Sequence, residues 1–553
     1  MNLSRKKMLL SMKNDNQVKP ALLVLFFFVF ALNDEAAGGI IEWNQLANKV
    51  ADLLPFLVLH NNETRCYGEV GCLNITRDWY GFTRWANTFP IPPQLMNTQF
   101  ILFTRKNPSK GAILNLSSGT SLDSSNFDAN NPTKIIIYGL FGSTKSAWIT
   151  DMISELLKHG DYNVIVVDYD LAALIPDFFK QVANARLLGL QIGYFVNYLV
   201  DNYGVDPKSV HIIGHSVGAQ VAAYAGNVIK NLGRISGLDP AVFFYHGMDP
   251  LVRLDSSDAD FVDAIHTNGI DHIFLGEGIS DLSGHVDFYV NGGKNQPGCQ
   301  AHEQGDELLS EFKKHGLREA ISALTGCEHL RSAKLFVDSI NNNCTFTGYR
   351  CSSYERFEEG GCFSCEGNSS CAVMGFNADQ NTNLVPGGRY FIDTGSSLPY
   401  CRQHYKVTLN LALPPEAESW VMGLVKVLLH TTNDTIEFNL TPEGSLKFGH
   451  GTSPSFIVTH PQQISNVSQI VLQWNKAIDI LHPENTCVFW CNDHLYVKSI
   501  TVETSDLSNT LEKIEGSNMA KLCSNGATNY ADIPSGSKAI FNNTCADNTD
   551  QDI

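Results

Sequence analysis

Between residues 134 and 266 the chain alternates short apolar runs with longer helical stretches, and this alternation constrains its fold most strongly. The apolar runs are rich in Val and Ile and occupy 134–138, 163–168, 209–213, 234–238 and 261–266. We expect strands at these runs and helices between them, at 184–203 and from Val217 onward. Strands that are apolar throughout and separated by helices are typical of a parallel sheet covered on both faces. The pattern predicts an α/β domain.

The pattern changes near residue 400. The preceding stretch, 292–400, is richer in Cys, Gly and Asn, and we expect it to form loops around the α/β core. Beyond residue 404, apolar and polar residues alternate in short runs at 405–411, 421–429, 470–474 and 496–502. Such short alternating strands are typical of a β-sandwich. A length of 553 residues accommodates two domains, which we place at 39–400 and 401–553.

The N-terminus predicts secretion. Five basic residues within 1–20 precede a wholly apolar run at 21–32. A helix of twelve residues spans only about 18 Å, short of the roughly 30 Å hydrocarbon layer of a membrane. We therefore expect a signal peptide at 1–38, cleaved somewhere within 32–39, with an uncleaved signal anchor as the alternative.

Cysteines and glycosylation motifs agree with an oxidising, extracellular destination. The chain has 14 Cys, an even number, and nine Asn-x-Ser/Thr motifs. These motifs begin at Asn62, Asn74, Asn115, Asn343, Asn368, Asn433, Asn439, Asn466 and Asn542. We expect disulfides among the closely spaced Cys66 and Cys72, Cys351 and Cys362, Cys365 and Cys371, and Cys523 and Cys545. The pairing of Cys344, Cys401, Cys487 and Cys491 stays open, and zinc is the weaker alternative for the cluster at 351–371.

The charge balance excludes one class of function. Lys and Arg number 39 against 57 Asp and Glu, which gives a net charge of −18. A nucleic-acid-binding protein needs a basic face, so we expect no nucleic-acid partner.

The most specific motif is Gly214-His215-Ser216-Val217-Gly218, a G-x-S-x-G pattern between a predicted strand and a predicted helix. In that context the motif indicates a nucleophilic serine on a tight turn, with the helix N-terminus beside it to stabilise negative charge. Ser216 is therefore the candidate nucleophile.

A nucleophilic serine needs a base and an acid that orients the base, and in this kind of fold the chain order is Ser, acid, His. Asp239 follows the next predicted strand, at the sheet edge that carries catalytic groups, and Asp255, Asp258 and Asp263 compete with it. Spacing alone does not choose the base. The candidates are His246, His266, His272, His285, His302, His315 and His329.

Six motifs together resemble the pancreatic triglyceride lipase family. They are 214–219, GLDP at 237–240, LVRLDSSD at 251–258, GHVDF at 284–288, 291–293 with 297–299, and HLRS at 329–332. They match in order and at similar spacing, and the similarity extends from about residue 66 to 545. The resemblance implies an α/β-hydrolase domain followed by a PLAT-type β-sandwich. It also implies a triad of Ser216, Asp239 and His329 that forms an acyl-enzyme.

The resemblance further implies an oxyanion hole made by the backbone N–H groups of Val217 and Leu140. Here the sequence departs from the family, because Tyr138-Gly139-Leu140 has Tyr in place of the usual His and Leu in place of the usual Phe. A main-chain donor survives both exchanges, so we expect them to alter rate and acyl-chain preference and leave the mechanism intact.

The resemblance implies a disulfide-closed lid between Cys299 and Cys327. Its apolar side chains would be Leu308, Leu309 and Phe312 in one stripe and Leu317, Ala320, Ile321 and Leu324 in another. Such a lid predicts stronger turnover of emulsified than of monomeric ester. An ordinary packed helical hairpin is the alternative.

Two further expectations come from the resemblance. A structural Ca²⁺ would bind the backbone carbonyls of Pro250 and Arg253 and the carboxylates of Asp255 and Asp258, with a plain acidic surface turn as the alternative. The sandwich would dock onto lipid or a cofactor protein, and the Val-Phe-Trp run at 488–490 is either an interface anchor or part of the core. No residue-level argument favours a colipase-like partner.

The sequence therefore predicts a secreted carboxylic ester hydrolase that acts on triacylglycerol at a lipid interface. The alternatives are phospholipase A1 or galactolipase activity and, from another class, a non-catalytic yolk-type lipid carrier. The long lid and the long segment 266–285 argue against a phospholipase A1, and the complete triad argues against a carrier. Residues 1–39 carry +2, so the secreted chain is near −20 and should resist anionic surfaces at low salt.

Overall fold

A computed structural model describes the chain from residue 62 to residue 545 with several gaps. The described ranges are 62–81, 83–114, 120–140, 142–173, 178–269, 281–299, 317–365, 369–381, 384, 387–432, 434–442, 444–464, 466–477, 493–504, 520–524 and 529–545. The predicted signal peptide, the lid residues Leu308, Leu309 and Phe312, and the segment 487–491 lie outside them. Of 317–325, which contains Leu317, Ile321 and Leu324, only the backbone is described.

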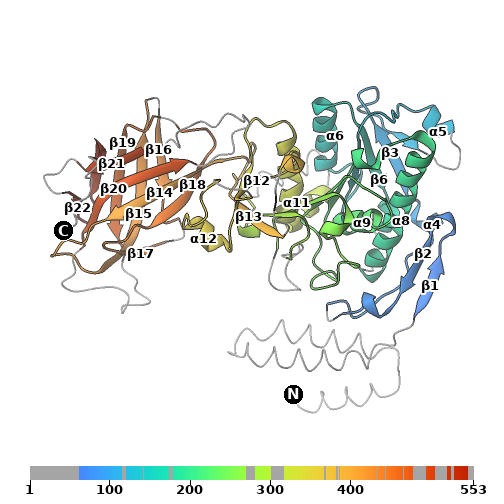
Figure 1. Ribbon diagram of the computed structural model, residues 1–553, viewed down its shortest axis with the longest axis horizontal. Helices are drawn as coiled ribbons and strands as arrows, with labels where there is room; N and C mark the ends of the chain where they lie inside the picture. The colour runs from blue at the N-terminus through green and yellow to red at the C-terminus, as the bar shows by residue number, and fades with distance from the viewer. Residues whose placement is uncertain are drawn as a thin grey trace, which may run out of the picture.

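A central sheet of eleven described strands dominates the N-terminal part (Figure 1). From edge to edge its strands are β12 (Cys371–Val373), β11 (Thr347–Arg350), β13 (Gly388–Ile392), β10 (Val286–Val290), β9 (Phe261–His266), β8 (Arg234–Leu238), β7 (Val210–His215), β5 (Thr133–Ile137), β6 (Asn163–Asp168), β3 (Gln99–Phe103) and β4 (Ala112–Leu114). From β13 to β6 all neighbouring strands are parallel, whereas both edges are antiparallel. The α/β-hydrolase fold is thereby confirmed.

Burial on both faces explains why the central strands are apolar at nearly every position. Ile135 lies between Ile165 of β6 and Ile212 of β7, and all three are fully buried. Helices α8 (Phe178–Tyr203) and α9 (Val217–Gly226) pack against each other on one side of the sheet, and α6 (Ala147–His159) packs against α11 (Leu317–Asn341) on the other (Figure 1). The shorter helices are α4 (Pro93–Met96), α5 (Thr120–Asp123), α7 (Asp170–Ala173) and α12 (Tyr354–Glu358).

Two sequence-based expectations need correction here. Helix α8 begins at Phe178, whereas we expected a start at 184, because buried Val182 and Ala183 extend the apolar face of the helix by more than a turn. Residues 292–400 are not merely loops around the core. They contribute α11 and three strands, among them β13, which extends the parallel sheet beside β10. The frequent Cys, Gly and Asn residues of 292–400 hid the apolar pattern of these elements.

The C-terminal part is a ten-stranded, antiparallel, sandwich-like sheet. Its main order is β16 (Thr435–Asn439), β15 (Trp420–His430), β19 (Gln469–Lys476), β23 (Lys538–Thr544), β21 (Ala520–Ser524), β20 (Leu495–Thr504), β14 (Gln403–Leu411) and β18 (Ser455–His460), with β17 (Leu446–Gly449) on β15 and β22 (Ala531–Ile533) on β20. Alternate residues are buried, as in β15, and Trp474 of β19 is the largest fully buried side chain. The last strand of the first sheet ends at Ile392 and the second sheet begins at Gln403.

Disulfides occur in both parts of the described chain. The pairs are Cys66–Cys72 (between β1, Glu63–Cys66, and β2, Cys72–Ile75), Cys299–Cys327, Cys344–Cys401, Cys351–Cys362, Cys365–Cys371 and Cys523–Cys545. The bond between Cys344 and Cys401 resolves a pairing that the sequence left open.

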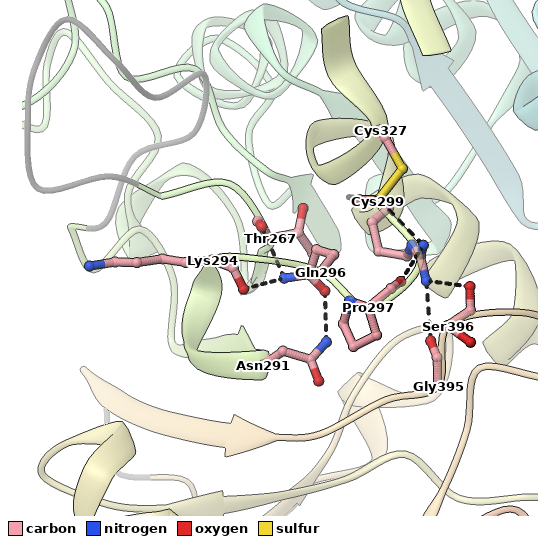
Figure 2. The surroundings of a disulfide bond; sticks show 10 residues. Thr267, Asn291, Lys294, Gln296, Pro297, Cys299, Cys327, Gly395 and Ser396 are labelled. Atoms are coloured by element: carbon pink, nitrogen blue, oxygen red, sulfur yellow. Dashed lines mark hydrogen bonds between the residues drawn. A yellow bond between two sulfur atoms is a disulfide. The ribbon is translucent and has the colours of Figure 1, made fainter. Parts of the chain in front are cut away.

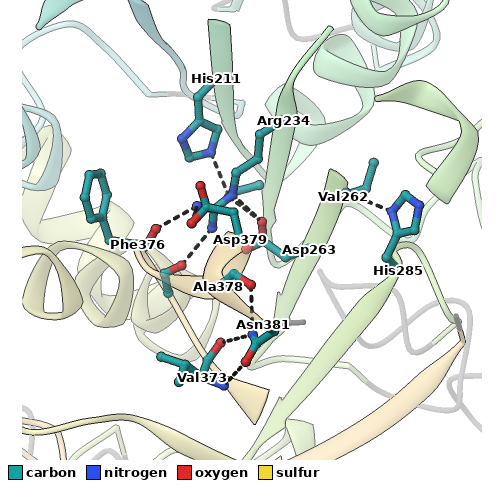
Figure 3. Close-up of polar contacts among 12 residues, drawn as sticks. His211, Arg234, Val262, Asp263, His285, Val373, Phe376, Ala378, Asp379 and Asn381 are labelled. Carbon is teal, nitrogen blue, oxygen red and sulfur yellow. Dashed lines mark hydrogen bonds and ion pairs between the residues drawn. The ribbon is translucent and has the colours of Figure 1, made fainter. Parts of the chain in front are cut away.

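A buried ion pair fixes the amino-terminal end of the sheet (Figure 3). Arg234 at the start of β8 donates to Asp263 of β9 over 2.9 Å and to the carbonyls of Gly375 and Phe376 over 2.8 and 2.6 Å. The guanidinium therefore ties the segment after β12 to the central strands. Among the described residues, no helix is long and apolar enough to cross a membrane.

Candidate active site

Ser216 lies at the tight turn between β7 and α9. Its backbone has a positive φ of 57° with ψ −124°, a conformation that a non-glycine residue adopts only under constraint. The Ser216 N–H donates to the carbonyl of Leu238 over 3.0 Å, and the Ser216 carbonyl accepts from Ala241 over 3.2 Å. This geometry is that of a nucleophile elbow, at the carboxyl end of a central strand.

The glycines around Ser216 are needed because backbone approaches backbone. A Cβ on Gly214 would lie 2.3 Å from the carbonyl oxygen of Gly218, and a Cβ on Gly218 would lie 2.4 Å from that of Ile137. A Cβ on Gly139 would lie 2.6 Å from the Cβ of Ser216. The motif therefore packs the start of α9 directly onto the end of β5.

Asp239 and His329 meet beside this turn. The Nδ1 atom of His329, on α11, lies 2.5 Å from Oδ2 of Asp239, which follows β8. Asp239 is fully buried, and its Oδ1 accepts from the backbone N–H groups of Thr267 and Asn268 over 2.9 and 3.2 Å. Those two bonds fix the carboxylate, so its second oxygen can hold the imidazole in one orientation.

A neighbouring loop supports the segment that holds Asp239 (Figure 2). Gln296 donates to the carbonyls of Thr267 and Val290 over 2.9 and 2.8 Å, and Asn291 donates to Gln296 over 2.8 Å. Gln296 is fully buried. Its amide therefore links the loop before Cys299 to the loop that binds the carboxylate.

His215, next to Ser216, contacts the candidate base. Its Nε2 donates to the carbonyl of His329 over 3.1 Å, and the two rings lie 4.5 Å apart. Burial, and then the neighbouring His329, lower the pKa of His215 to about 3. His215 thus stays neutral at ordinary pH and cannot place a second positive charge beside His329.

The two candidate oxyanion donors flank Ser216. Val217 is the first residue of α9, where a backbone N–H has no partner within its helix. Leu140 lies in the turn after β5, in which the Gly142 N–H donates to the Gly139 carbonyl over 3.3 Å. Within the described part of the chain, the Leu140 N–H donates no hydrogen bond.

An apolar pocket opens beside these donors. Leu140 and Val217 line it together with Met96, Ala172, Leu188 and Val221. Tyr169, which the sequence did not single out, also forms part of its wall. The lining is mainly apolar, and Gln181 and Asn184 are its polar members.

The competing candidates are engaged elsewhere. Asp263 pairs with Arg234, and His266 pairs with Asp287 over 2.7 Å with both side chains fully buried. His246 lies 2.9 Å from Asp281, and His285 accepts from the N–H of Val262 over 3.0 Å. The candidates at 272, 302 and 315 lie outside the described residues.

The lid segment is described only at its two ends. Cys299 and Cys327 form the expected bond, and Arg331 donates to the carbonyl of Pro297 over 2.8 Å (Figure 2). Helix α11 continues past Cys327 to Asn341, with non-helical backbone at Gly326. The closing disulfide therefore lies two residues from the candidate base.

The candidate calcium loop has two carboxylates in one short turn. Asp258 accepts from the Asp255 N–H over 2.9 Å, and Asp255 accepts from Ser257 over 2.7 Å. Asp258 is buried, and burial raises its pKa to about 8. Among the described residues Asp258 forms no ion pair, although the charge of the nearby Arg253 acts to lower its pKa. A buried carboxylate of this kind fits a bound cation, and the oxygen donors suit Ca²⁺. Among the residues described, no three or more His, Cys, Asp or Glu side chains are placed so that they could hold a metal ion together. The two carbonyls at Pro250 and Arg253 would have to complete the site.

Sequence reasoning missed several supporting residues. Nothing distinguished His215, Gln296 or Tyr169 from ordinary core residues, because each acts through contacts with segments distant in sequence. The sequence did single out Tyr138, which replaces the family's usual His, and the Tyr138 ring stacks on the Tyr169 ring.

Comparison with known proteins gives a consistent result. Residues 63–400 match the family model described as Lipase. Pancreatic lipase-related protein 2 from Bos taurus is 36% identical over 75% of this chain and 87% of that protein, and the Myocastor coypus protein of the same name is 34% identical over 78% and 90%. Inactive pancreatic lipase-related protein 1 from Mus musculus is 34% identical over 75% and 85%. A solved esterase, Pf2001 from Pyrococcus furiosus, aligns over 29% of this chain and 58% of that chain at 21% identity with a TM-score of 0.19, too slight a likeness to support an argument.

Proposed function

Because this chain belongs to the pancreatic lipase family, we propose that it is a secreted serine lipase that hydrolyses neutral glycerolipids, above all triacylglycerol, at a lipid–water interface. Family membership supports lipase-type ester hydrolysis. The finer proposal rests on the site, since some lipase-related relatives of similar identity carry the word inactive in their names and others do not.

One observation carries the proposal. The buried Asp239 holds His329 over 2.5 Å beside Ser216, whose φ is positive, and the neighbouring Val217 lines a mainly apolar pocket. This arrangement is suited to acyl transfer from a hydrophobic ester.

In the proposed reaction, the Oγ atom of Ser216 attacks the ester carbonyl while Nε2 of His329 takes its proton. Collapse of the tetrahedral intermediate expels the alcohol, which receives that proton from His329. Water then attacks the acyl-enzyme by the same route and releases the fatty acid. Asp239 keeps the proton on Nδ1 of His329 and stabilises the imidazolium that forms.

The oxyanion of the intermediate would accept hydrogen bonds from the N–H groups of Leu140 and Val217. Each such donor is worth on the order of 10²–10³ in turnover. Both donors belong to the backbone, so the Leu at position 140 does not remove this contribution.

The remaining parts have supporting roles in the proposal. Asp255 and Asp258, with the carbonyls of Pro250 and Arg253, would hold a structural Ca²⁺ that neutralises the buried carboxylate. The segment between Cys299 and Cys327 would gate the pocket, and the C-terminal sandwich would dock onto lipid. The described disulfides support a secreted chain.

Covalent labelling tests the enzyme claim. A serine-directed alkyl phosphonate should label the wild type stoichiometrically and should not label Ser216→Ala. Absence of label on the wild type, or undiminished label on Ser216→Ala, would leave a non-catalytic lipid carrier as the better account.

A substrate panel tests the finer claim. Emulsified triacylglycerol, phospholipid and galactolipid should be compared at equal interfacial area, with triacylglycerol expected to turn over fastest. Faster release of fatty acid from phospholipid or galactolipid would replace the proposed substrate class. Equal rates on monomeric and emulsified ester would contradict interfacial gating.

A further inference from the structure

We propose that Tyr169 is a positioning residue for this reaction, whose hydroxyl holds the carbonyl of Tyr138 and thereby fixes the turn that presents the Leu140 N–H. The inference rests on the proposed function. It concerns what holds the Leu140 N–H in place. The question arises for this chain because Tyr stands at position 138, where the family usually has His.

The two tyrosines form a closed unit between neighbouring strands. Their rings stack with centroids 4.5 Å apart and planes 7° apart. The Tyr169 hydroxyl donates to the Tyr138 carbonyl, and the Tyr169 N–H donates to the Tyr138 hydroxyl over 2.9 Å. Each residue therefore holds the backbone or hydroxyl of the other, so neither ring can turn without breaking a hydrogen bond.

The unit is anchored at the end of β6. The Tyr138 hydroxyl donates to Asp170 over 2.7 Å and lies 3.3 Å from Asp168. Tyr138 is fully buried and Tyr169 is 6% exposed. Burial raises the pKa of both hydroxyls far above the usual range, so both remain protonated donors at any working pH.

The held carbonyl lies one peptide before the proposed donor. The Tyr138 carbonyl belongs to the peptide that ends at Gly139, and the next peptide carries the Leu140 N–H. A Cβ on Gly142 would lie 2.9 Å from the Tyr138 ring, and a Cβ on Gly218 would lie 2.8 Å from the Tyr138 carbonyl oxygen. The turn is thus enclosed by the ring on one side and by the start of α9 on the other.

Tyr169 is also close to where the acyl chain would bind. Its ring lines the apolar pocket together with Leu140. A substitution that removes only the hydroxyl keeps this wall but leaves the Tyr138 carbonyl without its hydroxyl donor. That peptide can then rotate, and the following N–H loses its fixed direction. Such a loss weakens stabilisation of the transition state more than binding of the substrate.

The test is Tyr169→Phe in the full-length protein, assayed on a soluble chromogenic ester. We expect kcat to fall about tenfold, part of what a lost oxyanion donor costs, with KM within about twofold of wild type. The rate of phosphonate labelling should fall in parallel. Tyr194→Phe is the matched control, because it removes one tyrosine hydroxyl bond, to Glu69 on the surface, far along α8.

A second variant guards against loss of fold. Tyr138→Phe keeps the carbonyl that Tyr169 binds but removes the anchor to Asp170, and kcat should fall by a smaller factor, about threefold. Rates are normalised to the phosphonate-titrated fraction of active enzyme. Wild-type kcat and labelling rate in Tyr169→Phe would overturn the inference alone. So would a loss of activity that matches the loss of titratable sites, because the remaining sites would then turn over at the wild-type rate. A wild type that takes no label overturns the proposed function and this inference with it.

Discussion

Gly139 offers a sharp test of the site, because a single methyl group there meets the nucleophile. A Cβ built on Gly139 lies 2.6 Å from the Cβ and 3.1 Å from the Oγ of Ser216, and 3.2 Å from the carbonyl oxygen of His215. Carbon atoms in contact prefer about 3.5–4.0 Å. Gly139→Ala must therefore displace Ser216 or the donor turn by about 1 Å.

A displacement of that size is expected to cost much more activity than stability. A misplacement of about 1 Å lowers turnover by roughly 10²-fold, which corresponds to about 2.7 kcal/mol of transition-state stabilisation. Overpacking at one buried position costs about 1–3 kcal/mol of folding free energy, which a domain of this size tolerates. We expect kcat/KM on a soluble ester to fall at least about 100-fold while the protein stays folded.

The assay combines ester hydrolysis, phosphonate labelling and thermal unfolding. Gly449→Ala is the matched control, since the nearest atom to its Cβ is the end of the Thr452 side chain at 3.2 Å, in the C-terminal sheet. That variant should keep wild-type kcat/KM. If Gly139→Ala is folded and retains activity within about threefold of wild type, then Ser216 is not the reacting group or the packing described around it is wrong.

Three other experiments test separate parts of the molecule. Replacing both Cys299 and Cys327 by Ser removes the cross-link across a sequence separation of 28 and should lower the free energy of unfolding by about 3–4 kcal/mol. The unfolding temperature should fall, and an unchanged temperature would contradict a stabilising role for this disulfide. Burial lowers the pKa of His404 to about 4, so as the pH falls the unfolded state binds the proton before the folded state does. About 3 kcal/mol of folding stability should therefore be lost between about pH 6.5 and pH 4. His404→Asn should flatten that slope in urea unfolding and His460→Asn should not; equal slopes refute the assignment. Trp474→Ala should cost about 3–5 kcal/mol in the C-terminal sheet while soluble-ester turnover persists, and a parallel loss of turnover would show that the two parts unfold together.

The strands that could be predicted from the sequence are those with apolar residues on both faces. Runs 163–168, 234–238 and 261–266 agree with β6, β8 and β9 residue for residue, because burial on two sides leaves almost no polar position. β13 escaped prediction because its five residues include Gly388 and Arg389 and follow a stretch rich in Asn and Gly.

The candidate site divides in the same way. Ser216 could be placed from its motif, since two glycines and a strand-to-helix change leave one local geometry. Asp239 and His329 are 90 residues apart and meet only after the sheet forms, so spacing could not pair them. Residues that act through a neighbour, such as Tyr169 and Gln296, leave no local pattern at all.

The bend at Gly326 has a consequence for how this protein can change. The backbone there, at φ −133° and ψ 22°, interrupts α11 immediately before Cys327, and His329 follows on the far side of that disulfide. Arg331 holds the next turn to the carbonyls of Pro297 and Gly395. The Cys299–Cys327 bond and these two hydrogen bonds therefore hold the backbone on both sides of His329 at its distance from Asp239. A change of length between residues 299 and 326 would meet this cross-link before it reached the imidazole.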